Sequence, residues 1–272
     1  MARRRDELSD SFFTDALHGA IGSANSFALS RCPHNQLLRL ALRRMSTATT
    51  TTTTTAMQAQ GLLPLKASLD SSSVEATLQS LYNRAAQAFL YRDVVLATSL
   101  VASAFAMLQP PVAPTPDAFD SHRRKWDILR ITLESTVYTS PPDRASLPVA
   151  LRELLLLSPQ SFVTTSYTRS LALFTPSSLP RTPTAAFLPH QVLMTLVASS
   201  IQAVRPSIGR VMIEDWLSNR GQYDFIPSTG EAYEKVLELY CLHVLPRLEE
   251  WDYAKEFLAY EVELSPSKRT VR

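Results

Sequence analysis

Glycine is scarce in this sequence, and its scarcity argues against a large class of folds. The 272 residues include 6 glycines and 18 prolines. Proteins built from many short strands and tight turns use glycine wherever the backbone needs a positive φ. So few glycines, with prolines lying between apolar segments, favour helices joined by proline-marked connections.

Cysteine, long apolar runs and net charge are also scarce. Two cysteines, Cys32 and Cys241, give no disulfide framework and favour a reducing compartment. No stretch reaches the 18 apolar residues of a membrane-spanning helix, so the chain as given predicts none. The formal net charge of +2 is too small to predict a nucleic-acid partner.

Residues 1–70 lack a core-forming pattern, and we expect them to be disordered. They include the low-complexity tract Thr49–Thr55, which begins four residues after Met45 in the stretch Met45-Ser46-Thr47-Ala48. Met45 is therefore a plausible start of translation, with residues 1–44 a mispredicted or optional extension. A mitochondrial presequence is the alternative, although four acidic residues among the first fifteen count against it.

From residue 71 to residue 264, apolar side chains recur at the three-and-four spacing of amphipathic helices. Ser72 or Ser73 is expected to cap the first helix, and Asp93 the second, across the short connection Tyr91-Arg92. Further helices are predicted over about 120–138, 147–157, 159–174, 189–201, 206–217, 228–245 and 246–258. Residues 265–272 are basic and polar, and we expect a frayed tail.

About nine amphipathic helices with short turns predict an all-α protein. Each antiparallel pair leaves an apolar side that only a neighbouring pair can cover, which favours an α-solenoid. No strict 34-residue consensus is visible, so the fold class is an irregular tetratricopeptide-like solenoid of antiparallel helix pairs, one interaction domain over residues 71–264.

The sequence offers no catalytic, cofactor or metal motif. His243 lies near Cys241, but positions i and i+2 of a helix point to different faces. Phosphate-loop, zinc-protease and nucleophile-elbow patterns do not occur. We therefore expect no cofactor and no enzyme; a helical enzyme stays the third alternative and would need a deep pocket with convergent carboxylates.

Candidate partner-binding residues lie at a turn and in a basic run. Phe89, Tyr91 and Arg92 surround the first turn, where aromatic side chains of helical repeats can face a partner. Arg123, Arg124 and Lys125 precede the third apolar stripe and could dock acidic protein or lipid head groups, although such a run more often solvates the start of a helix. The tryptophans Trp126, Trp216 and Trp251 all fall on apolar stripes and are expected in the core.

The C-terminal part of the chain is acidic. From Pro206 to Leu264 there are twelve acidic residues and five basic ones. A solvated helix face is the plainer interpretation, and a surface for a basic partner is the other.

Several segments of this sequence resemble one protein family. They are Leu188-Pro189-His190-Gln191-Val192-Leu193, Gly209, Trp216-Leu217, Tyr233, Val244-Leu245-Pro246-Arg247-Leu248 and Ala254-Lys255-Glu256. The hairpin with Ala85-Ala86, Phe89 and Arg92-Asp93, and the helix from Lys125 to Val137, fit the same order. Together they are similar to the family of peroxin twenty-six and its fungal counterparts, collinearly over about residues 74–262 and at low identity.

The resemblance implies an α-helical domain on the cytosolic face of the peroxisomal membrane. It would be a non-catalytic adaptor that recruits the peroxisomal AAA ATPases, which extract the ubiquitinated import receptor. Members of the family are tail-anchored, whereas this chain ends at Arg272 without a hydrophobic tail. The basic Lys268-Arg269 is a common flank of such an anchor and favours a tail missing from this chain. A soluble relative, or a generic cytosolic α-solenoid scaffold unrelated to peroxisomes that binds basic peptides, is the alternative.

Overall fold

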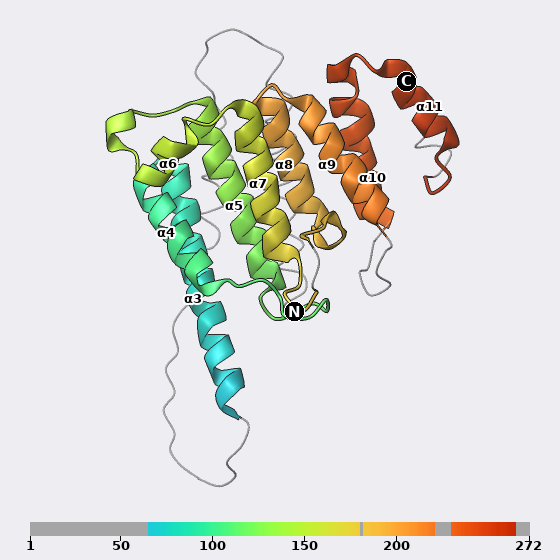
Figure 1. Ribbon diagram of the computed structural model, residues 1–272. Helices are drawn as coiled ribbons and strands as arrows, with labels where there is room; N and C mark the ends of the chain where they lie inside the picture. Colours follow the sequence, from blue (N-terminus) through green and yellow to red (C-terminus); the bar gives the residue numbers. More distant parts are fainter. Residues whose placement is uncertain (1–64, 180–181, 221–229, 265–272) are drawn as a thin grey trace, which may run out of the picture. The chain divides into compact units, whose positions relative to one another are not determined.

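The computed structural model describes residues 65–179, 182–220 and 230–264, and all regular structure in these ranges is helical (Figure 1). The predictions for residues 1–64 and 265–272, and for the start of a helix at residue 228, lie outside the described residues. The nine α-helices of the described ranges are α3 (Leu65–Leu90), α4 (Val94–Met107), α5 (Asp120–Thr139), α6 (Val149–Leu154), α7 (Pro159–Phe174), α8 (His190–Gln202), α9 (Pro206–Asn219), α10 (Gly230–Leu239) and α11 (Trp251–Tyr260). The prediction of an all-α protein is confirmed for this part of the chain.

Local capping signals set several helix starts as expected. The Asp93 carboxylate accepts a hydrogen bond from the Leu96 N–H, and the Ser158 hydroxyl accepts one from the Ser161 N–H. Pro159 and Pro206 each occupy the first turn of the helix they open, where the missing N–H costs nothing.

Two predicted helix boundaries were wrong. The first helix begins at Leu65, so Ser72 and Ser73 lie inside α3 instead of capping it. The helix predicted over 147–157 is shorter, because α6 runs only from Val149 to Leu154, and Ser146 belongs to a separate 3₁₀ turn, Arg144–Ser146.

The end of the chain is more irregular than a plain pair of helices. After α10, residues Tyr240–Val244 form a π-helical turn, and Pro246–Leu248 form a 3₁₀ turn. Glu249 then takes a left-handed conformation with φ 62°, and α11 begins at Trp251. The predicted bend at Pro246 is thus present, but the helix after it starts five residues later.

The helices pack side by side, with α8 contacting α5, α7, α9 and α10 (Figure 1). At the α3–α4 side, one apolar core joins Leu78 on α3, Leu100 on α4 and Trp126 on α5. The small side chains Ala85, Ala88, Ala97 and Ala104 are buried here, as expected for two helices in close approach. Within the described residues, no helix is long and apolar enough to cross a bilayer.

The predicted inward positions hold for most helices, with a few exceptions. Trp126 is fully buried and Trp216 is 8% exposed, but Trp251 is 55% exposed, so its assignment to the core was wrong. Leu96 and Val211, which lie on the apolar stripes of α4 and α9, are also exposed. These exceptions leave apolar side chains on the surface of α4, α9 and α11.

Candidate functional site

The turn between α3 and α4 presents two of the predicted partner-binding residues to solvent. Tyr91 is 72% exposed and Arg92 is exposed, whereas Phe89 is half-buried against the core. The turn is fixed by the backbone: the Asp93 N–H donates to the Ala88 carbonyl oxygen at 2.9 Å, and Arg92 has φ 61°. A rigid turn therefore displays a tyrosine and a guanidinium together.

The outer face of α4 continues this surface with apolar side chains. None of the 14 residues of α4 is charged. Its exposed side carries Val95, Leu96 and Met107, which are 50%, 40% and 36% exposed. The opposite side of the same helix buries Ala97, Leu100, Val101 and Ala104. We name Tyr91, Val95, Leu96 and Met107 the α4 surface.

The basic run lies inside the third helix, within the bounds of about 120–138 that were predicted for it. Because α5 begins at Asp120, Arg123 to Lys125 are in its first two turns. Arg123 is 2% exposed, and its guanidinium donates to both carboxylate oxygens of Asp117 and, at 3.2 Å, to the Gln109 carbonyl oxygen. It anchors the connection between α4 and α5. Arg124 and Lys125 are half-buried, so Arg123 does not share a surface patch with them.

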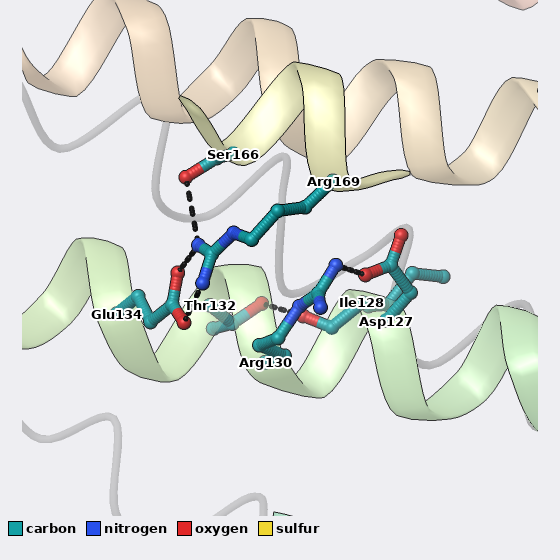
Figure 2. Close-up of polar contacts among 7 residues, drawn as sticks. All are labelled: Asp127, Ile128, Arg130, Thr132, Glu134, Ser166 and Arg169. Atoms are coloured by element: carbon teal, nitrogen blue, oxygen red, sulfur yellow. Dashed lines mark hydrogen bonds and ion pairs between the residues drawn. The ribbon is translucent and has the colours of Figure 1, made fainter. Parts of the chain in front are cut away.

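A cluster of charged side chains lies between α5 and α7, where sequence reasoning expected none (Figure 2). Asp127 is completely buried and forms an ion pair with Arg130, one turn further along α5. The Arg130 guanidinium also stacks over the Phe105 ring of α4, with 4.5 Å to the ring centroid. Burial raises the pKa of the Asp127 carboxyl, and the nearby positive charge of Arg130 opposes that rise.

The second ion pair of this cluster joins two helices. Figure 2 shows Arg169 of α7 reaching both carboxylate oxygens of Glu134 on α5, while its guanidinium also lies 3.4 Å from the Ser166 hydroxyl. Glu134 is 8% exposed. A bidentate arginine–carboxylate pair fixes the orientation of both groups. The pair therefore sets how α7 lies along α5, and it gives no sign of a substrate.

These buried charges could have been suspected from spacing alone. Asp127 and Glu134 are seven residues apart, which places them on one face of α5, next to the buried Trp126 and Leu133. Arg169, however, is 35 residues from Glu134 in sequence. No local pattern identifies such a partner.

A polar network connects α9 with the C-terminal segment. The Arg210 guanidinium donates to Glu214 at 2.7 Å and also pairs with Glu250. Tyr240 donates to the same Glu214 oxygen at 2.7 Å, and Arg210 lies over the Tyr253 ring, 5.1 Å from its centroid. Burial and the bond to Glu214 raise the pKa of the Tyr240 phenol. The network links Arg210 and Glu214 of α9 to Tyr240, to Glu250 and to Tyr253 at the start of α11.

A second arginine repeats this arrangement nearby. Arg220 lies 3.8 Å from the centroid of the Tyr233 ring and pairs with Glu263. The Tyr233 hydroxyl donates to Glu261. Only Ala254 and Leu258 of α11 are buried, so polar contacts carry much of its attachment.

In the part of the chain that the structure describes, no group of three or more histidine, cysteine or carboxylate side chains could hold a metal ion. Cys241 is buried in the π-helical turn, and burial raises the pKa of its thiol to about 11.

No protein-family model, curated protein or solved structure matches this chain.

Proposed function

We propose that this chain is a non-catalytic adaptor that holds a protein partner on the α4 surface. The observation that carries the proposal is the exposure of Val95, Leu96 and Met107 on a helix without a single charged residue, next to the exposed Tyr91. Exposed apolar and aromatic side chains are typical of protein-binding sites. An exposed helix face of this kind could receive an apolar helix of the partner.

The architecture that we propose is an irregular tetratricopeptide-like solenoid. Alternate helices contact one another: α5 with α8 and α8 with α10 along one layer, and α7 with α9 along the other. Such contacts between equivalent helices of successive pairs are how helical repeats stack. In a solenoid the terminal pair has a neighbour on one side only, which supports an exposed outer face on α4.

The partners that we propose are the peroxisomal AAA ATPases, and the chain would act on the cytosolic face of the peroxisome. This step is supported by the collinear resemblance to the peroxin twenty-six family, which includes the α3–α4 hairpin. Two of the hairpin residues that carry the resemblance, Phe89 and Asp93, form backbone hydrogen bonds in the turn that presents Tyr91 and Arg92.

The test is a binding assay between the full chain and purified N-terminal domains of the two ATPases. Leu96→Asp combined with Val95→Asp places two charges on the α4 surface and should weaken binding at least tenfold, because each charge must be desolvated in the complex. Leu156→Asp is the matched control, since Leu156 is 77% exposed beyond the end of α6. It should leave binding unchanged.

Two outcomes would overturn the proposal. Binding of the ATPase domains that is equal in the wild type and the double variant would remove the α4 surface as the site. No binding at all by the wild-type chain, with circular dichroism showing a folded protein, would remove the ATPases as partners and favour the generic scaffold.

A further inference from the structure

Three connections at one end of the helix bundle each present an exposed apolar side chain. The long helices from α3 to α9 run alternately in opposite directions, so the α3–α4, α5–α7 and α8–α9 connections lie at the same end, which is uppermost in Figure 1. The most exposed apolar residue of each connection, in that order, is Tyr91, Leu156 and Val204, at 72%, 77% and 74%. We name these three side chains the apolar tips.

An exposed arginine accompanies each apolar tip. Arg92 and Arg205 directly follow Tyr91 and Val204, and Arg152 lies on α6, within the connection that carries the third tip. None of the three guanidinium groups forms an ion pair with another residue of the described ranges. We name them the tip arginines. Their planar N–H groups suit the oxygens of a phosphate group.

The acidic residues of these connections offset the positive charge only in part. Residues 91–93, 140–158 and 203–205 contain four basic and three acidic side chains. The carboxylates of Asp93 and Asp143 accept hydrogen bonds from backbone N–H groups at the starts of the turns that they cap. The charge excess is therefore small, and attraction to an anionic surface needs the apolar tips as a second contribution.

Val204 has a backbone conformation that the fold itself does not explain. Its φ is 57°, in the left-handed region that a β-branched residue rarely adopts, and the turn is fixed by the Arg205 N–H, which donates to the Ser200 carbonyl oxygen at 2.8 Å. An exposed valine gains little from packing in return. Conformational cost of this kind is typical of residues whose side chains serve a function.

The separation of the apolar tips favours a lipid surface over a protein. Each tip lies on a different connection, so a protein would need a separate pocket for every one. The boundary between lipid headgroups and acyl chains takes up isolated apolar and aromatic side chains, while anionic headgroups attract arginine.

We propose that this end of the bundle docks on the surface of a membrane that contains anionic lipid. The apolar tips enter the boundary between headgroups and acyl chains, and the tip arginines contact lipid phosphates. This interaction goes beyond the adaptor function and does not depend on the ATPases. Tyr91 belongs to the α4 surface as well, so the test leaves it unchanged.

The experiment measures co-sedimentation of the full chain with vesicles of phosphatidylcholine, alone or with phosphatidylserine added. We expect binding to the anionic vesicles, little binding to phosphatidylcholine alone, and weaker binding as salt is raised. Leu156→Asp with Val204→Gly removes two apolar tips and should weaken binding to the anionic vesicles about tenfold. Arg152→Gln with Arg205→Gln should weaken it by a similar factor.

Val112→Asp is the matched control, because Val112 is 75% exposed on the α4–α5 connection. That connection lies at the opposite end of the bundle, where the Ser177 N–H donates to the Pro111 carbonyl oxygen at 2.9 Å just after α7 ends. The control should leave vesicle binding unchanged. Val204→Gly alone suits the positive φ, so thermal unfolding should show it at least as stable as wild type, and its loss of binding would not come from unfolding.

Three outcomes would overturn the proposal. The first is no binding of the wild-type chain to anionic vesicles; capture of the chain by polyglutamate beads in that case would assign the tip arginines to an acidic protein. The second is equal vesicle binding by wild type and both double variants, and the third is an equal loss in Val112→Asp. ATPase binding enters none of these readouts, so failure of the adaptor function would leave them unchanged.

Discussion

Gly209 is the position where the packing of two helices makes the sharpest prediction. It lies buried near the start of α9, which contacts α8. A Cβ atom added there would lie 2.5 Å from the Ser200 hydroxyl oxygen and 3.2 Å from a Val197 methyl carbon. The glycine therefore lets α9 approach α8 more closely than any other residue would.

Two opposing effects decide the outcome of Gly209→Ala. Alanine is favoured over glycine inside a helix by about 1 kcal/mol. Against this, the Ser200 side chain must rotate away and lose its bond to the Val197 carbonyl oxygen, at 2.7 Å in a fully buried position. Leaving a buried hydroxyl without a partner costs about 1–3 kcal/mol, and crowding in a packed interior costs a similar amount. Together these terms give a net loss of about 1–5 kcal/mol in the free energy of unfolding.

The measurement is urea and thermal unfolding of the full chain, followed by circular dichroism. For an ordered part of this size, each kcal/mol lowers Tm by about 2–4 °C. Ser200→Ala removes the oxygen that the new Cβ would strike, so Gly209→Ala should cost much less in that background. Gly230→Ala is the matched control, because an added Cβ there meets no atom within 4 Å. It should change stability little.

A stabilising effect of Gly209→Ala would refute this reasoning. So would equal costs in the presence and absence of the Ser200 hydroxyl, since the close approach would then not lie where the structure places it.

Two further predictions concern buried titratable groups. Burial raises the pKa of Asp127 above its unfolded value of 3.8, so the folded state binds the proton more tightly than the unfolded state does. This linkage stabilises the fold below the unfolded pKa, and the stabilisation is lost as pH rises through the folded pKa. Asp127→Asn should therefore lose this stability more slowly than wild type as pH is raised from about 4, measured by urea unfolding; parallel curves would contradict it. The Cys241 thiol is 5% exposed with a pKa of about 11, so peptide mapping should find it unmodified by iodoacetamide at neutral pH in the native protein and modified in urea. Native labelling as fast as unfolded labelling would contradict its burial.

Local chemistry explains which helix starts could be predicted from the sequence. Asp93 and Ser158 satisfy backbone N–H groups within three residues, so their roles depend on nothing distant. The start of α3 was missed because three consecutive serines suggested a cap. A proline directly before Leu65 in the sequence was the better signal, since proline is favoured at helix starts.

Trp251 was misplaced for a reason that concerns helix phase. Its spacing from Leu248 fits one continuous helix, but the left-handed residue Glu249 interrupts the helical rotation. The helix that restarts at Trp251 turns Ala254 and Leu258 inward and leaves the indole outside. A single backbone conformation thus converts a predicted core residue into a surface residue.

The candidate surfaces were only partly predictable. Tyr91 and Arg92 could be placed at a turn because the connection is short. Arg123, in contrast, was assigned to a basic surface, but it is buried and pairs with Asp117 and the Gln109 carbonyl oxygen. A charge run in sequence does not reveal which members pair internally. The stacked arginines of the C-terminal region were missed for the same reason: Arg210 and Glu250 are 40 residues apart.

Among the described residues, three helix ends have a positive φ at a residue other than glycine. Arg92, Val204 and Glu249 have φ of 61°, 57° and 62°, and after each one the next N–H bonds back to a carbonyl five residues earlier. Glycine is the common choice at such positions, and a β-branched valine is the least suited. Glycine at these exposed turns, which lie outside the core, would therefore raise the free energy of unfolding of the domain. Its tolerance to damaging mutations could rise through single surface changes to glycine, without any repacking of its interior.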